Sequence, residues 1–474
     1  MSKVITIDPV TRVEGHGKVT IHLDDQGQVQ ESHFHIQEFR GFEKFCQGRM
    51  AWEMPIITTR ICGICPVSHH LAAAKACDDL FQVTIPPAGA KLRELMHMGQ
   101  TIHSHALHFF YLAAPDLLFG LNAPPEDRNV VGVIKKDPVL GQKAIRLRQI
   151  GQNIVERVGG RSIHPVSAIP GGMSKSLAHE DRFAISTELK EALALAKEAL
   201  ALVKQVNEQY KGLISDFASF KTGYMGLVKD GALELYDGTL KLIDSLGQQM
   251  EEFEPRNYLE YIGEKSVENS YLKFPFYKKL GWPQGIYRVA PVARLNVADR
   301  ITTHLANQEL AQFKALGQGR PVQESLYYHY ARIIELLYAV ERAQQLVEDD
   351  EIVSREVRVP VTRQAGEGVG VIEAPRGTLI HHYVADDLGK LEKVNIIVAT
   401  AHNYAAMDQA VNNVAQKVLN GAEVTENLLN QVEMAIRCYD PCLSCATHQL
   451  GKMPLDLEVI NTQGEVVKRL IREG

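Results

Sequence analysis

Apolar residues recur at every third or fourth position over much of the chain, the spacing that lines one face of an α-helix. Leu92, Leu95 and Ile102 keep this spacing between residues 86 and 118. Residues 180–221, rich in Ala, Leu, Lys and Glu, predict one long, uninterrupted amphipathic helix. Its polar side mixes both charge signs, which favours the core of a helix bundle over a membrane surface. Helices are predicted at 64–80, 86–118, 138–160, 180–221, 299–316, 323–347, 404–419 and 424–438.

Two stretches change to the alternating apolar and polar positions of β-strands. Residues 3–38 alternate in two runs separated by a turn signal at residues 24–27. Residues 356–400 form a second strand region, which ends in the apolar run 396–400, also predicted as a strand. The glycines at 366, 368 and 370 lack the spacing and the strand-to-helix context of a dinucleotide fingerprint. A nicotinamide is therefore expected on another subunit.

These elements predict a fold that is mostly α with small peripheral β-sheets, an α+β fold around a central bundle of long helices. We expect residues 1–448 to form a single large unit, opening with a β segment at residues 1–40, and residues 449–474 to form a C-terminal extension. A chain of 474 residues can bury a sizeable core, and 45% hydrophobic with 23% charged residues is typical of a globular protein.

Charge and hydropathy argue against two classes of partner. The formal net charge is -6 and like charges do not cluster in long runs, so the chain lacks the electrostatic footprint of a nucleic-acid-binding protein. No apolar run reaches the roughly 18 residues of a membrane span, and the N-terminus lacks the layout of a signal peptide. We expect a cytoplasmic protein with no nucleic acid and no membrane span.

The chain has seven cysteines, four of which form two C-x-x-C pairs: Cys62 with Cys65, and Cys442 with Cys445. This spacing lets two thiolates point at one metal, and the two pairs together supply four sulfur ligands. On spacing alone, a structural zinc site and a four-cysteine iron-sulfur cluster both remain open. The pairs lie at opposite ends of the chain, whereas a zinc ribbon usually holds them roughly 15–20 residues apart. A cofactor where the N- and C-terminal segments meet is therefore favoured.

The residues around these pairs carry a specific pattern. R-x-C-G-x-C at residues 60–65 and D-P-C-x-x-C-x-x-H at residues 440–448 resemble the signatures of the large subunit of nickel-iron hydrogenases. R-G-F-E-K-F at 40–45 and E-A-P-R-G at 373–377 resemble the cytoplasmic, bidirectional, NAD-linked branch, and the likeness covers essentially the whole chain. The resemblance implies reversible heterolytic cleavage of dihydrogen, with electrons passed through a small subunit to NAD(P) or ferredoxin-linked partner subunits.

The resemblance also implies three metals: nickel, iron with carbon monoxide and cyanide ligands, and magnesium. Cys62 and Cys442 would be terminal ligands of nickel, and Cys65 and Cys445 would bridge to iron. The magnesium ligands implied are Glu43, the Ile396 carbonyl and His448, oxygen and imidazole groups beneath the site. From the residues alone, Glu43 could equally be an exposed residue at a helix start.

Splitting dihydrogen heterolytically needs a Lewis acid and a nearby base. The resemblance assigns the base to the Cys442 sulfur and then to Glu14, and places Arg376 above the open metal position, beside Pro375. Thr400 would donate to a cyanide on iron, and His69 would donate to a bridging thiolate. Without the resemblance, Glu14 and Arg376 would be read as solvated residues and His69 as a core histidine.

The chain departs from better-known relatives at Ser104, where they place an aspartate over the metal. Its neighbours His103, His105 and His108 lie two and three positions apart on an apolar helix, which favours packing over metal binding. Another departure is His402-Asn403, where relatives carry Trp-Asn, so the assignment of the neighbouring Thr400 rests on motif position.

The four cysteines of the site leave no further set for an electron-relay cluster. We therefore expect a small subunit with an iron-sulfur cluster and, from the resemblance, flavin- and iron-sulfur-containing diaphorase subunits. Residues 449–474 resemble the extension that a maturation endopeptidase removes after His448 once insertion factors have delivered nickel. The tail itself holds a strand-like run at 455–460 and a turn at 463–464.

Three other functions stay open. A hydrogen-sensing regulatory subunit would carry the same metal site and turn over slowly. A relative that has lost the metal and serves in a quinone-reducing complex would lack the four cysteines present here. A zinc-stapled interaction protein would contain zinc and no iron.

Overall fold

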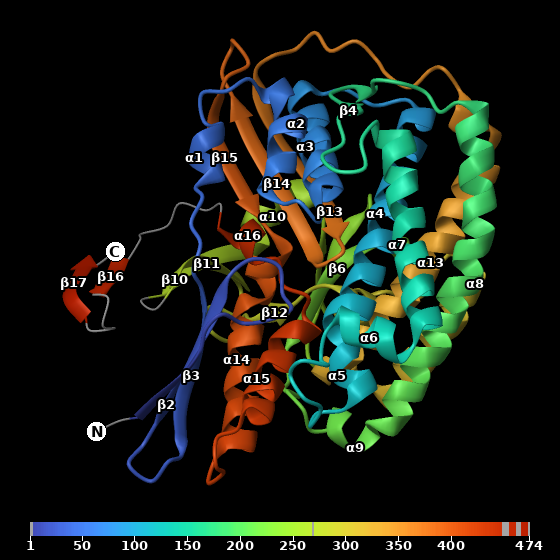
Figure 1. Ribbon diagram of the computed structural model, residues 1–474. Coiled ribbons are helices and arrows are strands. Elements are labelled where there is room, and N and C mark those ends of the chain that lie inside the picture. Colours follow the sequence, from blue (N-terminus) through green and yellow to red (C-terminus); the bar gives the residue numbers. More distant parts are fainter. Residues whose placement is uncertain (1–2, 268–269, 448–454, 461–465, 473–474) are drawn as a thin grey trace.

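The computed structural model describes residues 3–267, 270–447, 455–460 and 466–472. Long helices make up one side of the molecule, and the sheets and C-terminal helices make up the other (Figure 1). Between the two sides lie the segments that carry the cysteine pairs. The long helices and small sheets match the α+β fold predicted from the apolar spacing.

Four long helices form the bundle: α4 (Pro87–Leu107), α7 (Pro138–Gly159), α8 (His179–Gln209) and α13 (Tyr328–Glu348). α4 and α7 approach closely because Gly99 and Gly151 face each other, and a Cβ on Gly151 would stand 2.6 Å from the Gly99 carbonyl oxygen. α8 buries one face, with residues three or four positions apart: Ile185, Leu189, Ala192, Ala196, Ala199, Val203 and Val206.

Helix α3 (Pro66–Phe81) lies on an antiparallel sheet of order β13-β14-β15 (Gly366–Ala374, Gly377–Ala385, Leu391–Ile397). Glycines make this contact possible, because a Cβ on Gly368 would come within 2.2 Å of the Leu80 nitrogen. A Cβ on Gly370 would come within 2.1 Å of the Ala72 carbonyl oxygen. The glycine-rich segment thus serves helix-to-strand packing.

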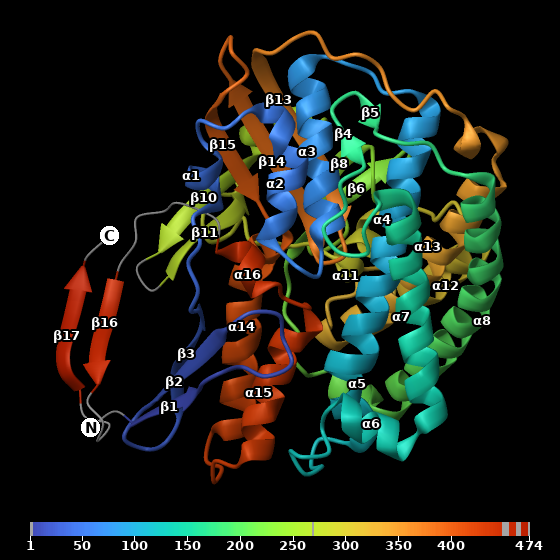
Figure 2. The same ribbon diagram turned by 45° about the horizontal axis from the view of Figure 1, so that its top comes forward.

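The N-terminal sheet, of order β1-β2-β3 (Lys3–Ile7, Gly17–Leu23, Val29–Ile36), is antiparallel and packs on α14 (Ala399–Leu419). Polar side chains of α14 hold the sheet's edge: Asp408 accepts from the Phe34 N–H over 2.8 Å, and Asn412 accepts from the Ser32 N–H over 3.1 Å. These contacts join the two ends of the chain, and Figure 2 shows β3 beside α14.

The remaining elements are short and mostly lie between these units. A third sheet, mixed because β12 pairs with β6 in parallel, has the order β12-β6-β8-β9, with β7 paired to β6, and β10 and β11 form a hairpin. The strands are β4 (Ala168–Ile169), β5 (Gly172–Met173), β6 (Gly223–Lys229), β7 (Ala232–Leu233), β8 (Thr239–Ile243), β9 (Gln249–Phe253), β10 (Ile262–Val267), β11 (Ser270–Tyr277) and β12 (Tyr287–Arg288). The helices are α1 (Phe42–Cys46), α2 (Met54–Ile57), α5 (Ala114–Phe119), α6 (Val130–Lys136), α9 (Lys211–Ile214), α10 (Tyr258–Tyr261), α11 (Pro291–Val297), α12 (His304–Leu316), α15 (Glu426–Cys438) and α16 (Leu443–Ala446).

Several predicted elements differ from the structure. The helix predicted at 86–118 is divided into α4, a π-helical turn at His108–Ala113 and α5. The helix expected at 180–221 is interrupted: α8 ends at Gln209 and only the short α9 follows. The strand expected at 396–400 ends at Ile397, and Thr400 already lies in the first turn of α14. The helix expected from residue 299 begins at His304. Apolar runs near element ends do not distinguish strand from helix, so tertiary contacts decide these boundaries.

The C-terminal tail contributes a β-hairpin of β16 (Leu455–Ile460) and β17 (Val466–Arg472), which both views show beside the main body of the molecule (Figures 1 and 2). The strand predicted at 455–460 is present, and the turn predicted at 463–464 lies outside the described residues. Within the part of the chain that the structure describes, no helix is both long and apolar enough to cross a membrane.

Candidate metal centre

Both cysteine pairs lie where a loop becomes a helix. Cys65 caps the N-terminus of α3 and Cys442 caps that of α16, which contains Cys445. The backbone N–H groups of Ile64 and Cys65 each donate to the Cys62 sulfur over 3.3 Å. Backbone donors at a helix start favour the ionised form of a thiol. The Cys62 sulfur is therefore prepared to be a thiolate.

The two pairs meet in the interior of the molecule. The sulfurs of Cys62 and Cys442 are 3.2 Å apart, and those of Cys65 and Cys445 are 3.5 Å apart. All four sulfurs lie within 4.8 Å of one another, and all four residues are buried. Among the described residues, this is the one such group of His, Cys, Asp or Glu that could hold a metal ion.

The protonation of the four thiols is strongly coupled. Hydrogen bonds from Cys442 and Cys445 hold the pKa of Cys62 well below its usual range. Burial raises the pKa of Cys442 and of Cys445, because a second and third negative charge at this distance would be poorly solvated. Four buried sulfurs can all ionise only beside a cation, so the donor set fits a soft, thiolate-binding metal.

Glu14 lies against the C-terminal cysteine motif. Its Oε2 accepts from the Cys442 sulfur over 2.9 Å and from the Ser444 N–H over 3.1 Å. The Glu14 carbonyl accepts from the Leu443 N–H over 3.0 Å. Gly15 has a φ of 84° and no Cβ, which this approach requires because a Cβ would stand 2.8 Å from that of Leu443. Burial, with the nearby Cys62, raises the pKa of Glu14.

Arg376 faces the cysteines from the turn between β13 and β14. Its Nη2 donates to Asp440 Oδ1 over 3.0 Å, and its Nη1 lies 3.4 Å from Ser104 Oγ. Burial opposes the charge on Arg376, but Asp440 and the cysteines keep the pKa of the guanidinium high. Burial also raises the pKa of Asp440 to about 6. Arg376 and the cysteines Cys65, Cys442 and Cys445 line one small cavity.

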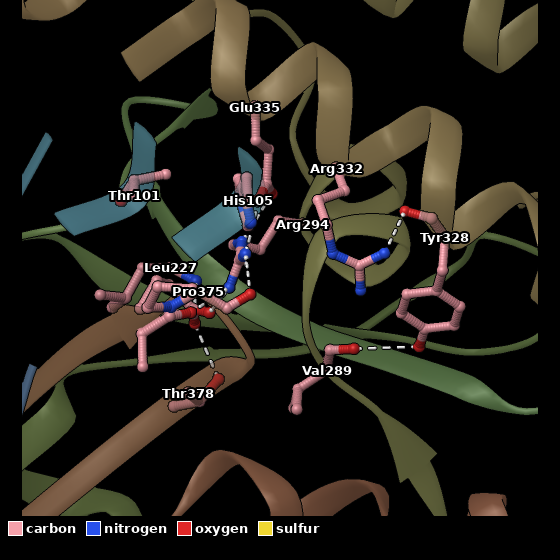
Figure 3. Close-up of polar contacts among 12 residues, drawn as sticks. Thr101, His105, Leu227, Val289, Arg294, Tyr328, Arg332, Glu335, Pro375 and Thr378 are labelled. Carbon is pink, nitrogen blue, oxygen red and sulfur yellow. Dashed lines mark hydrogen bonds and ion pairs between the residues drawn. The ribbon is translucent and has the colours of Figure 1, made fainter. Parts of the chain in front are cut away.

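A buried ion network fixes the backbone that carries Arg376. Figure 3 shows Arg294 between Glu335 and the chain at Pro375. Arg294 Nε and Nη2 each donate to Glu335 over 2.6 Å, and Nη1 donates to Glu373 over 2.8 Å. Its Nη2 also donates to the Pro375 carbonyl over 3.2 Å. This network is not predicted from the sequence, since no local pattern marks a charge that is fully buried.

His69 connects the site to a second buried chain of polar groups. Its Nε2 lies 3.5 Å from the Cys445 sulfur and its Nδ1 lies 3.1 Å from His381 Nε2. His381 Nδ1 lies 2.5 Å from the Tyr383 hydroxyl, which is buried in the core. The neighbouring His70 points away, accepting from the Ala168 N–H over 2.9 Å. Of the two, His69 faces the cysteines.

The other predicted residues lie in three places. Thr400 Oγ1 accepts from the Cys442 N–H over 3.0 Å, beside the cysteine cavity. Glu43 is buried, and its Oε1 accepts from the Ile396 N–H over 2.8 Å, so these two predicted magnesium ligands are in contact. His448 lies outside the described residues.

The histidines of α4 and the turn after it are held by protein groups. His105 Nε2 lies 3.0 Å from Glu335, and His108 Nε2 donates to the Arg437 carbonyl over 2.8 Å. Burial lowers the pKa of His103 to about 3, so its imidazole is neutral. These contacts are those expected of packed core histidines.

A further polar chain leaves the cysteine site toward solvent. Ser444 Oγ donates to Glu38 Oε2 over 3.1 Å, and Glu38 also binds Nδ1 of the exposed His16. Neither Glu38 nor Ser444 is predicted from the sequence as a site residue. Ser444 lies inside the second cysteine motif, but only the fold brings Glu38 to it.

Comparisons with known proteins agree on one family. A family model described as "Nickel-dependent hydrogenase" matches residues 40–130 and 243–448, and a model described as "HoxL-like" matches residues 4–39. A chain of the vhu F420-non-reducing hydrogenase of Methanococcus voltae is 50% identical over 412 residues, 87% of this chain and 98% of the relative. NAD-reducing hydrogenase HoxS subunit beta of Cupriavidus necator is 41% identical over 488 residues, with 100% of both chains covered.

A solved structure gives the same result. The chain superimposes on NAD+-reducing NiFe-hydrogenase in the H2-reduced state with a TM-score of 0.92 and 47% sequence identity. The match covers 94% of this chain and 99% of that chain.

Proposed function

The chain belongs to the nickel-dependent hydrogenase family, and from this premise we propose that it is the catalytic large subunit of a bidirectional, NAD-linked hydrogenase. Family membership confirms the resemblance carried by the two cysteine motifs. The enzyme is a nickel-iron hydrogenase, whose general activity is the cleavage of dihydrogen. One observation carries the proposal for this site: four buried cysteine sulfurs lie within 4.8 Å of one another, with a carboxylate 2.9 Å from one of them.

The four cysteines would hold nickel and iron. Cys62 and Cys442 are proposed as terminal nickel ligands, and Cys65 and Cys445 as the bridges to an iron that carries carbon monoxide and cyanide. When bound, the metals supply the Lewis acid that polarises dihydrogen. The 3.5 Å contact of His69 with the Cys445 sulfur supports its role as donor to a bridging thiolate.

The protein supplies the base. The Cys442 sulfur would take the proton first, and Glu14 Oε2 would receive it over the 2.9 Å contact. Burial shifts the pKa of Glu14 upward, toward neutral pH, and a group whose pKa lies nearer the working pH can both accept and release a proton. Two backbone N–H groups, of Leu443 and Ser444, hold Glu14 against the cysteine motif, so the transfer distance is fixed by the fold.

Arg376, Pro375 and Thr400 would shape the rest of the site. The Arg376 guanidinium faces the cysteine cavity and its Asp440 partner fixes its direction, so its fork could bond a diatomic ligand of iron. Thr400 Oγ1 accepts a backbone hydrogen bond and keeps its own hydrogen for a cyanide. Ser104, in place of an aspartate, lies 3.4 Å from Arg376 and leaves this guanidinium with Asp440 as its charged partner.

A magnesium ion is proposed at Glu43, the Ile396 carbonyl and His448. The hydrogen bond from the Ile396 N–H to Glu43 supports the proposal, because it places the Glu43 carboxylate, an oxygen ligand of the kind that magnesium prefers, beside residue 396. His448 would join as the new C-terminus, after a maturation endopeptidase has removed residues 449–474 and insertion factors have delivered nickel.

Electrons would leave through other subunits. The three remaining cysteines, Cys46, Cys77 and Cys438, are buried, and burial raises the pKa of Cys46 and of Cys438 to about 12. Thiols in that state are poor metal ligands. We therefore propose a small subunit with an iron-sulfur cluster as the first acceptor, and diaphorase subunits with flavin and iron-sulfur clusters beyond it.

The relative from Methanococcus voltae is an F420-non-reducing hydrogenase. A second candidate is a hydrogenase of that kind whose electrons pass to neither F420 nor NAD. A hydrogen sensor on the same metal site would turn over slowly. The complex purified from its native source, under hydrogen, separates these functions. Rapid reduction of NAD+ supports the proposal, reduction of an artificial viologen dye without NAD+ reduction supports the second candidate, and very slow reduction of both supports a sensor.

A further inference from the structure

Arg40 touches both cysteine segments at once. Its Nη2 donates to the carbonyl of Ile61 and to the carbonyl of Ser444. Ile61 directly precedes Cys62, and Ser444 directly precedes Cys445. One guanidinium nitrogen carries two hydrogens, so a single side chain can join two backbone segments that lie at opposite ends of the sequence.

The backbone around Arg40 holds the second segment as well. The N–H groups of Arg40 and Gly41 both donate to the Thr447 carbonyl, over 2.9 and 3.2 Å. Arg40 Nε donates to Thr447 Oγ1 over 3.1 Å. Gly41 has a φ of 57°, a left-handed conformation that glycine adopts without strain and that lets consecutive N–H groups turn toward one acceptor.

The cysteine site needs such a connection. The sulfurs of the two pairs approach to 3.2 and 3.5 Å across segments that no covalent bond joins. Before a metal is present no cation draws the four sulfurs together, so the metal-free chain must hold the pairs by other contacts. Hydrogen bonds from a charged guanidinium are among the strongest available and are geometrically specific.

We propose that Arg40 holds the two cysteine pairs together in the metal-free chain, so that all four sulfurs are already in place to bind one metal. Arg40 thereby increases the affinity of the chain for nickel. Arg40 acts as a positioning residue, because it contacts the carbonyls beside the cysteines and none of the sulfurs. The inference rests on the proposed function for the identity of the metal. It requires only that the four cysteines bind a thiolate-seeking ion.

The test uses the full-length metal-free chain and nickel(II) alone. Arg40→Met removes the donors and keeps an apolar stem, and Arg40→Lys keeps the charge but loses the planar fork. Arg49→Met is the matched control. Arg49 lies on the same short segment, stacks 4.2 Å from the Phe45 ring and donates to the Phe45 carbonyl, but touches neither cysteine motif.

Nickel affinity is read from the thiolate absorption of the complex. We expect Arg40→Met to weaken binding by about tenfold or more, the size expected when charge-assisted hydrogen bonds are lost. Arg40→Lys should fall between Arg40→Met and the parent chain, and Arg49→Met should bind as the parent does. The midpoint of thermal unfolding is measured alongside, and a local positioning role leaves it close to the parent value in Arg40→Lys.

A second readout follows the sulfurs themselves. Mild oxidation of the metal-free chain with diamide should form the Cys62–Cys442 disulfide quickly in the parent and several-fold more slowly in Arg40→Met, as mapped by peptide mass spectrometry. Equal nickel affinity in Arg40→Met, Arg49→Met and the parent would overturn the proposal. If Arg40→Met does not fold, unchanged affinity in Arg40→Lys overturns it instead. A chain that binds nickel as expected but belongs to a complex without hydrogen oxidation would contradict the proposed function and leave the Arg40 inference intact.

Discussion

The Cys442 sulfur donates a hydrogen bond to Glu14 Oε2 over 2.9 Å, although the two residues lie 428 positions apart in the sequence. The contact exists because the connection between β1 and β2, which contains Glu14, lies against the start of the short helix α16. Glu14 and Cys442 pair as an isolated β-bridge, and Gly15 leaves the space that this pairing needs. The acid-base chemistry that we propose for Glu14 and Cys442 therefore depends on how the two ends of the chain pack.

Glu14→Gln should abolish hydrogen-dependent dye reduction, by at least about 100-fold, because the amide keeps the hydrogen bonds but cannot carry the proton. The nickel content of the purified variant should match that of the parent, which separates a lost proton step from a lost metal. Glu31→Gln is a suitable control, since Glu31 is an exposed glutamate on β3 of the same sheet. Normal hydrogen uptake in Glu14→Gln would remove Glu14 from the mechanism.

Glu335→Gln should destabilise the chain by roughly 3–5 kcal/mol, because it leaves the fully buried Arg294 without its main carboxylate partner. The free energy of unfolding in urea measures this loss. Glu198→Gln breaks the exposed pair with Lys143 and should cost less than about 1 kcal/mol. Equal losses in both variants would show that the Arg294 network does not stabilise the fold as its burial indicates.

Stability should fall as the pH drops below the ordinary pKa of histidine. Burial lowers the pKa of His402 from 6.5 to about 3, so the unfolded chain binds a proton in this window that the folded chain does not. The free energy of unfolding must then decrease with falling pH, by about 1.4 kcal/mol per pH unit for each such histidine. Unfolding of the metal-free chain, measured from pH 7 to 5, should show a shallower slope in His402→Gln than in the parent. An identical slope in both would mean that His402 does not titrate as its burial predicts.

The mature enzyme should end at His448. We expect the intact mass of the active large subunit to correspond to residues 1–448, if the extension is removed, as we propose, once nickel is in place. Inactive precursor from cells starved of nickel should keep Gly474. An active form that still carries Gly474 would contradict the proposed maturation.

The cysteine pairs could be predicted from the sequence, because the two residues of each pair are close along the chain and their spacing is itself the signal. The spacing of Cys62 with Cys65 and of Cys442 with Cys445 predicts metal binding without any knowledge of the fold. In the same way, the three-residue spacing of apolar residues such as Leu92 and Leu95 predicts a helix from local sequence alone. Contacts between distant segments could not be predicted in this way. Nothing near Glu38 in the sequence indicates that Ser444 will donate to it.

Buried ion pairs and the exact ends of helices and strands depend on tertiary packing, which local sequence patterns do not reveal. Arg294 and Glu335 look like surface residues in the sequence, yet they are paired in the core behind Pro375. Thr400 follows an apolar run that favours a strand, but the packing of α14 on the N-terminal sheet places it in a helix. The helix predicted at 180–221 ends at Gln209, where the chain turns to poor helix formers, among them Gly212, Ser215 and Asp216.

The central claim is that thiolates from both ends of the chain hold one nickel-iron centre. Metal analysis of the mature large subunit, combined with its infrared spectrum, tests this most directly, since iron-bound carbon monoxide and cyanide absorb where no protein group does. We predict nickel and iron in equal amounts, together with those bands, and the loss of both metals on Cys442→Ser. A subunit that contains zinc without iron and shows no such bands would contradict the account.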